Sequence, residues 1–155
     1  LKKGDAVLFK NPAGGFCLRD TDTNHHVFLS GGIGITPFRS MILDVVYTQR
    51  NIPITLIASF ATNTDSIFYD ELTALAKKHP SIQIVYTLTQ YENSSSWNGE
   101  AGRITPQLLE EYVRDKKAAT YFIVGAPQMV EDIEGMLYKM GVAEKQIRLE
   151  MFSGY

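Results

Sequence analysis

Hydrophobic positions follow two periodicities along the chain. Short apolar runs rich in β-branched and aromatic residues predict buried strands, and between them hydrophobic residues recur every three or four positions, as on an amphipathic helix. The residues Phe38, Met41, Ile42, Val45 and Val46, for instance, predict one such helix after the first run. The expected strands are 27–29, 54–60, 82–88, 121–124 and 147–152.

Four helices are expected between and after these strands. Thr36 and Thr105 are good N-cap residues, and each precedes a proline, which is favoured at the first helical position. Asp65 or Ser66 is expected to cap the second helix, and Pro127 to open the fourth.

Strand and helix alternate through five strands, which predicts an α/β fold with a doubly wound, five-stranded parallel sheet. The expected strand order is 3-2-1-4-5, with helices on both faces, because the strands are apolar on both sides. Ligands in such folds bind beyond the carboxyl ends of the strands, where the strand order reverses.

The first residues differ from this pattern. A short strand is expected at 6–9 and a loop at 11–15, and regular alternation begins only after about His25. We therefore expect residues 1–24 to be a tail and linker and residues 25–155 to be the main domain. The chain starts without Met or a signal-peptide core, so it is expected to be a piece of a longer protein.

Composition narrows the classes of function. The chain has 45% hydrophobic and 21% charged residues, and 15 basic against 17 acidic side chains, with no block of like charge. This balance argues against a nucleic-acid partner, and the apolar runs are too short to cross a membrane. A lone Cys17 excludes a disulfide framework, and the pair His25 and His26 is interpreted as linker rather than as metal ligands. We expect a cytoplasmic domain without a metal site.

The segment Ser30–Pro37 lies directly between the first strand and the first helix. Gly31, Gly32 and Gly34 allow the backbone to approach a ligand, and the helix start directs N–H groups toward it, which suits a pyrophosphate. Pro37 stands where the usual dinucleotide fingerprint has its third glycine, and no acidic residue ends the second strand. The alternative is a tight turn without a ligand.

A second glycine turn follows the fourth strand, at Gly125-Ala126-Pro127-Gln128-Met129. In the expected strand order the first and fourth strands are neighbours, so both turns flank one crevice, which would suit a flat ring and a diphosphate. The alternative is an ordinary helix entry.

Five segments together resemble the nucleotide domain of the ferredoxin–NADP⁺ reductase family, over nearly the whole chain. They are Gly4–Phe16, Gly31–Pro37, Trp97–Ile104, Gly125–Met129 and Glu150–Tyr155. The first is similar to the exit from the family's flavin-binding barrel, the second and fourth to its two nucleotide motifs, and the last to its carboxyl terminus.

The resemblance implies hydride transfer between NAD(P)H and FAD, followed by electron delivery to an acceptor such as an iron–sulfur protein. The family's flavin-binding Arg-x-Tyr-Ser motif is absent, so FAD is expected to be held by an upstream domain, and the isolated chain is expected to bind nucleotide without turnover. The alternative is a non-catalytic nucleotide-binding or interaction subunit with the same fold.

The resemblance also implies roles for residues of the first motif. Gly31, Gly32, Gly34, Thr36 and Pro37 would bound the diphosphate and nicotinamide. Thr36 has two interpretations, because its hydroxyl would cap the helix in any case and would line the nicotinamide pocket only in the second.

The second motif would face the nicotinamide from the other side through Gly125, Ala126, Pro127 and Met129. Val124 replaces a cysteine that many members of the family carry, which puts the rate of hydride transfer in question rather than nucleotide binding.

The terminal aromatic residue of the family covers the flavin, and Tyr155 would do so here, or would be a frayed end. Phe152 is assigned to the core. Thr89 and Gln90 stand where NADP-specific members of the family have a Ser-Arg pair. The cation nearest to these two residues is Arg103, which is either a ligand of a 2′-phosphate or a solvated charge. This favours NADH.

Overall fold

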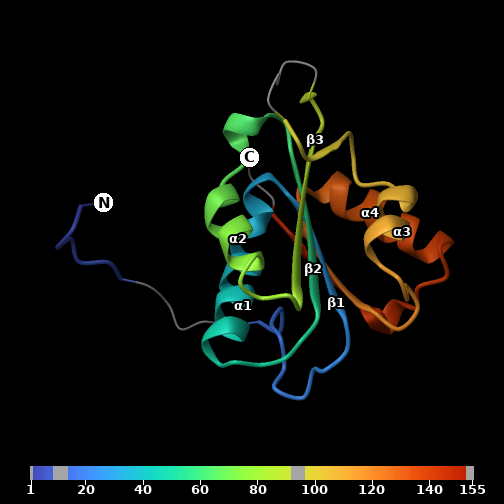
Figure 1. The fold of residues 1–155 in the computed structure, drawn as a ribbon, viewed down its shortest axis with the longest axis horizontal. Helices are drawn as coiled ribbons and strands as arrows, with labels where there is room; N and C mark the ends of the chain where they lie inside the picture. The colour runs from blue at the N-terminus through green and yellow to red at the C-terminus, as the bar shows by residue number, and fades with distance from the viewer. Residues whose placement is uncertain (1, 9–13, 92–96, 153–155) are drawn as a thin grey trace.

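The computed structural model describes residues 2–8, 14–91 and 97–152, in which strands and helices alternate (Figure 1). The strands are β1 (His26–Gly31), β2 (Ile54–Phe60), β3 (Ile82–Leu88), β4 (Glu100–Ala101), β5 (Thr120–Gly125) and β6 (Ile147–Met151). The helices are α1 (Ile35–Tyr47), α2 (Tyr69–Ala76), α3 (Pro106–Tyr112) and α4 (Pro127–Lys139), with 3₁₀ turns at Gly32–Gly34, Asn63–Asp65 and Glu144–Gln146.

The strands form one parallel sheet in the order β4-β3-β2-β1-β5-β6. The α/β class with a parallel sheet is confirmed, and the five expected strands keep their predicted order. The count of five was wrong, because β4 pairs with Thr87 and Leu88 at one edge. This two-residue strand has no apolar run to signal it and is fixed by polar contacts, including the hydrogen bond from the Thr87 hydroxyl to the Gly102 carbonyl (2.6 Å).

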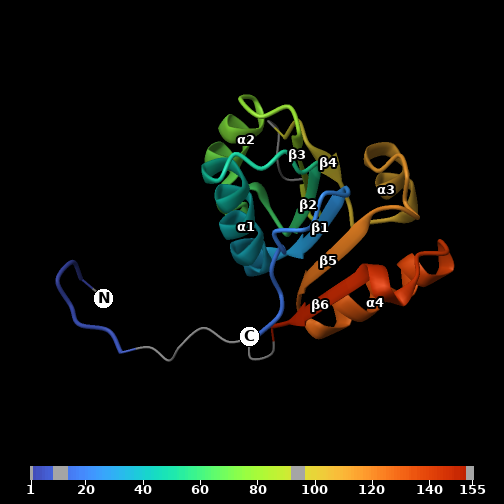
Figure 2. The ribbon, with the colours of Figure 1, turned by 90° about the horizontal axis from the view of Figure 1, so that it is seen from below.

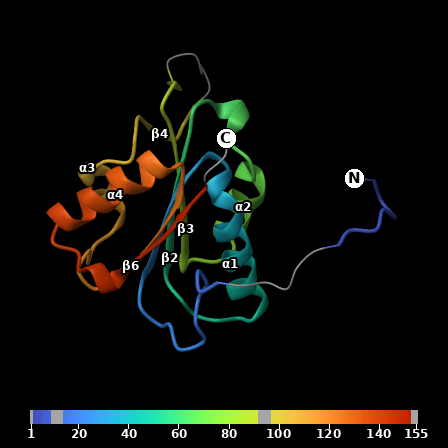
Figure 3. The ribbon, with the colours of Figure 1, turned by 180° about the vertical axis from the view of Figure 1, so that it is seen from behind.

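Two helical layers enclose the sheet. Helices α1 and α2 cover one face and α3 and α4 the other, as seen from below in Figure 2 and from behind in Figure 3. Val27, Phe28 and Leu29 of β1 are all fully buried, and Phe28 stacks on Phe38 of α1 with ring centroids 4.6 Å apart. Burial on both faces explains why the central strands are continuous apolar runs.

The expected strand at 6–9 is not formed by Ala6–Leu8, and Phe9 lies outside the described residues. From residue 14 onward this first segment packs against the main domain. The Phe16 ring meets the ring of Phe122 edge to face at 5.3 Å, and the Arg148 guanidinium donates to the Cys17 carbonyl (3.0 Å). The division at residue 24 stays a prediction.

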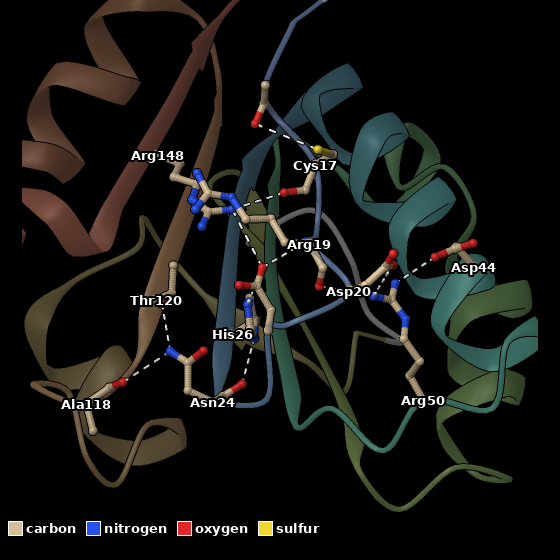
Figure 4. A network of polar contacts seen from close by, with 12 residues as sticks. Cys17, Arg19, Asp20, Asn24, His26, Asp44, Arg50, Ala118, Thr120 and Arg148 are labelled. Carbon is tan, nitrogen blue, oxygen red and sulfur yellow. Dashed lines mark hydrogen bonds and ion pairs between the residues drawn. The ribbon is translucent and has the colours of Figure 1, made fainter.

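The interpretation of His26 as a linker residue was wrong, because His26 is a fully buried residue of β1, whereas His25 directly precedes the strand. Its Nδ1 lies 2.6 Å from the Asn24 carbonyl, and its Nε2 lies 3.5 Å from the carboxylate of Asp22 (Figure 4). Arg148 reaches the same carboxylate at 3.7 Å. Burial lowers the pKa of His26 despite this carboxylate.

The described residues contain no cluster of three or more histidine, cysteine or acidic side chains arranged to hold a metal ion. In the same part of the chain, every helix is too short or too polar to span a membrane.

Candidate nucleotide-binding site

The two glycine turns meet at the carboxyl ends of neighbouring strands. Strands β1 and β5 pair in parallel up to Ser30 opposite Val124, so Gly31 and Gly125 follow side by side. A Cβ atom added to Gly125 would lie 3.5 Å from the Gly31 nitrogen and 3.7 Å from its Cα. Both corners therefore lie at one edge of the sheet, at the point where the strand order reverses.

A cavity of about 850 Å³ opens at this edge. Gly31 and Gly32 of the first turn line it, as do Gly125, Ala126 and Met129 of the second. A volume of this size is typical of cofactor sites, which are mostly apolar with a few placed polar groups. The structure thus brings these five expected binding residues of the two glycine turns to one cavity, which two further expected residues also line.

Gly32 exposes its backbone to this cavity without obstruction. Its φ angle is +51°, a left-handed conformation that favours glycine, and an added Cβ would meet no atom within 4 Å. A ligand can therefore approach this backbone closely, which is what a diphosphate needs from a glycine turn.

The expected N-cap at Thr36 was wrong. The 3₁₀ turn Gly32–Gly34 runs directly into α1, so the helix begins at Ile35 with Gly34 as N-cap, and the Thr36 hydroxyl donates to the Ile33 carbonyl (3.0 Å). Thr36 and Pro37 are both in the first turn of the helix, and neither lines the cavity.

Gly34 is buried and packs against strand β5 instead of lining the cavity. An added Cβ would overlap the Val124 carbonyl oxygen and lie 2.8 Å from its carbonyl carbon. The absence of a side chain at Gly34 lets the start of α1 approach the sheet. Pro127, at the first position of α4 as predicted, is also absent from the cavity lining.

Thr89 and Arg103 line the cavity on its other side. Thr89 is held at the end of β3 by bonds from its backbone N–H (2.9 Å) and its hydroxyl (3.3 Å) to the Phe60 carbonyl. Two carboxylates that were not proposed as site residues, Asp65 and Asp132, share this lining. Arg103 is the one cationic side chain among the described lining residues.

Asp65 belongs to a capping box on the turn after β2. Its Oδ2 accepts from the Thr62 N–H (3.1 Å) and the Thr62 hydroxyl (2.6 Å). Neither Asp65 nor Ser66 caps α2, which begins at Tyr69 after Phe68 in a left-handed conformation. Asp65 lies in the turn beyond β2 rather than at the strand end where dinucleotide folds place an acidic group, so the sequence carried no signal for it as a site residue.

Phe152 follows β6 and also lines the cavity, where its backbone N–H donates to the Gly125 carbonyl (2.9 Å). Its side chain is partly buried and packs against the core on the α1 face, so Phe152 lies at the margin of the core rather than within it. Tyr155 lies outside the described residues, so its expected role is a prediction.

Comparisons with known proteins decide the family. The sequence model of the family described as "Oxidoreductase NAD-binding domain" matches residues 28–135, more than half of the chain. The chain belongs to this family. Every cavity-lining residue of the two glycine turns lies within the matched range.

Curated relatives of this NAD-binding domain are longer proteins. The chain is 33% identical to a component of the Na(+)-translocating NADH-quinone reductase of Klebsiella pneumoniae, over 99% of the chain and 39% of that protein. It is 30% identical to the corresponding component from Methylococcus capsulatus, over 99% and 39%. The chain thus spans about two fifths of the length of these relatives.

Solved structures share the fold of this NAD-binding domain. The CS-b5R domains of human Ncb5or, solved in the NAD+ form, align with a TM-score of 0.71 and 26% identity, over 82% of this chain and 36% of that chain. The Amycolatopsis cytochrome P450 reductase GcoB aligns with a TM-score of 0.78 and 21% identity, over 91% and 42%.

Proposed function

We propose that this domain binds NADH in the cavity beside Gly31 and Gly125 and presents it to FAD held by another part of the protein. The observation that carries the proposal is that two glycine turns from neighbouring strands open onto one cavity of cofactor size. A bound NADH supplies a hydride, which a flavin accepts as two electrons and a proton equivalent.

The residues that line the cavity have different roles in binding NADH. The open backbone at Gly32 approaches the diphosphate, and Arg103 contributes a positive charge to it. Gly125, Ala126 and Met129 border the nicotinamide, and Thr89 faces the adenosine half. Since the Thr36 hydroxyl is engaged by the Ile33 carbonyl, its contribution is to hold the turn rather than to touch the nucleotide. Gly34, Pro37 and Pro127 shape the two helix starts.

Charge in the cavity supports NADH over NADPH. The described lining carries two carboxylates, Asp65 and Asp132, against the single cation Arg103. A 2′-phosphate adds about two negative charges, which the carboxylates repel, whereas a free ribose hydroxyl can donate a hydrogen bond to them. The curated relatives, whose names include NADH, agree with this choice.

The roles of the whole protein follow as parts of the same proposal. FAD would be held by an upstream domain, and the acceptor would be a redox partner such as an iron–sulfur protein. Tyr155 would cover the flavin until the nicotinamide arrives. A cytoplasmic location is a prediction from composition alone.

Titration calorimetry on the chain as it stands tests the proposal. We expect saturable binding of NADH and weaker binding of NADPH. An Arg103→Ala variant should lower the affinity for both nucleotides. Lys145→Ala is the control for loss of one positive charge, because Lys145 lies in the 3₁₀ turn before β6 and does not line the cavity. The absence of saturable heat with either nucleotide would contradict the proposed function.

A further inference from the structure

A two-pronged ion pair joins helix α1 to helix α2, which lie side by side on one face of the sheet (Figures 1 and 2). The Arg39 guanidinium donates through Nε and Nη2 to the two carboxylate oxygens of Glu71, both at 2.7 Å. Surface ion pairs usually contribute little to stability, but two parallel bonds fix the relative orientation of the groups they join. The first turn of α2, which contains Glu71, is therefore held to α1 in one geometry.

The same guanidinium contacts the residue directly before α2. Its central carbon lies 4.8 Å from the centroid of the Phe68 ring, a cation–π contact. Phe68 has a φ angle of +60°, a left-handed conformation that residues with a Cβ atom rarely adopt because it costs free energy. Surrounding contacts must hold the backbone in this conformation. Arg39 supplies two of them, one to the ring of Phe68 and one to the helix turn that follows it.

The turn between β2 and α2 forms one wall of the nucleotide cavity. Four of its residues line the cavity: Ala61, Thr64, Asp65 and Ile67. The sheet fixes the start of this turn, since the Gln90 N–H donates to the Ala61 carbonyl (2.9 Å). The turn ends at Ile67, directly before Phe68, so its far end depends on the contacts of Arg39. The place of the wall relative to the cavity is thus set by the sheet at one end and by α1 at the other.

We propose that Arg39 is a positioning residue that governs the choice between NADH and NADPH. Through Glu71 and Phe68 it fixes the far end of the turn between β2 and α2. The Asp65 carboxylate on that turn is thereby held where it repels a 2′-phosphate. The inference rests on the proposed function and adds to it a residue that does not itself line the cavity.

The sign of the effect separates positioning from charge. Arg39 is a cation, so by charge alone its removal would disfavour NADPH, which carries the additional phosphate, and would raise the ratio of the Kd for NADPH to the Kd for NADH. If Arg39 instead positions a repelling carboxylate, its removal lowers this ratio. The two explanations therefore predict opposite changes in one measured quantity.

Titration calorimetry with NADH and with NADPH on the whole chain measures this ratio. Arg39→Ala should lower the ratio about threefold, less than the roughly fivefold effect of one charge in a hydrated site, because the carboxylate stays on the turn. Arg39→Lys keeps the charge but loses the planar fork, so it should also lower the ratio. Arg50→Ala is the matched control, because Arg50 pairs with Asp44 of the same helix at 2.7 Å and does not line the cavity (Figure 4).

A second background shows whether the effect passes through Asp65. In an Asp65→Asn chain, Arg39→Ala should cause no further fall of the ratio, since no carboxylate remains to be positioned. A merely structural role would lower Tm in both backgrounds and leave the ratio unchanged. Thermal unfolding of each variant sets a titration temperature at which all of them are folded.

Three results would overturn the inference. The first is a ratio that stays the same or rises in Arg39→Ala; the second is an equal further fall in the Asp65→Asn chain; the third is an unaltered chain that binds both nucleotides equally. Each of these leaves nucleotide binding in the cavity intact. If the unaltered chain binds neither nucleotide, the proposed function fails and this inference fails with it, so the two failures are distinguishable.

Discussion

A substitution at Gly34 separates packing from ligand contact in the first glycine turn. Gly34 is buried, and an alanine methyl group there would overlap the Val124 carbonyl oxygen and lie 3.2 Å from Val124 Cγ1. Val124 cannot retreat, because it is paired with Ser30 on one side and with Glu150 on the other. The start of α1 must therefore move away from the sheet.

The loss of stability expected for Gly34→Ala follows from this rigidity. Overpacking a buried site lowers the free energy of unfolding by about 1–3 kcal/mol. Because the atoms that the new methyl group meets belong to the backbone of a paired strand, we expect Gly34→Ala to lose about 3 kcal/mol. In a domain of this size, each kcal/mol lowers Tm by about 2–4 °C, so we expect a decrease of roughly 6–12 °C.

Thermal unfolding and NADH titration together provide the assay, with Gly32→Ala as the matched control. At Gly32 an added methyl group meets nothing within 4 Å, so only the left-handed φ angle opposes it, at about 1 kcal/mol. We expect Gly34→Ala to lose stability and, below its Tm, to keep most of its NADH affinity. Gly32→Ala should show the reverse pattern. A Gly34→Ala chain that is as stable as the unaltered one but no longer binds NADH would refute this reasoning.

Three further outcomes are expected. Asp65→Asn should reduce the preference for NADH over NADPH about fivefold, since a charge near the 2′ position is worth ~1 kcal/mol in a hydrated site; an unchanged ratio of Kd values would count against it. Phe16→Ala should cost about 2 kcal/mol in urea unfolding, because the ring packs on Phe122 and is only half buried; no change would show that the first segment is not part of the core. Burial lowers the pKa of His25 and of His26, so each binds its proton less tightly in the folded chain than in the unfolded one. The free energy of unfolding should therefore fall as pH drops below their ordinary pKa of 6.5, and urea titrations on both sides of that pH check the sign.

The parts of the fold that the sequence predicted are those in which one local signal outweighs the rest. Apolar runs located the central strands, and the pair Thr105 and Pro106 located α3, where the Thr105 hydroxyl accepts from the Leu108 N–H at 3.2 Å. Alternation of strand and helix then gave a parallel sheet, because a crossover helix returns the chain in the same direction. These signals act over a few residues and need no knowledge of distant neighbours.

The errors lie where distant contacts decide the local structure. Thr36 has the same local signal as Thr105, but the 3₁₀ turn before it starts the helix earlier, since Gly34 can pack directly against β5. His26 looks like a polar residue before a strand, yet the carboxylate that faces it comes from Asp22, on a segment held in place by Arg148 of β6. Strand β4 exists because Gly102 returns to β3.

The glycines of the site show why a motif predicts a location better than it predicts roles. Gly32 is open to the cavity and has a left-handed φ angle. At Gly34 the backbone of β5 lies where a side chain would begin, and at Gly31 and Gly125 the sulfur of Met129 lies there. The sequence treats all four as places where a backbone approaches a ligand, because each simply lacks a side chain. Strand β5 occupies that space at Gly34 and the Met129 sulfur occupies it at Gly31 and Gly125, so only at Gly32 is the space free for a ligand. Loss of nucleotide binding after substitution of a motif glycine is therefore evidence of ligand contact at Gly32 alone. At Gly31, Gly34 and Gly125 it first reports the displacement of protein atoms that shape the cavity.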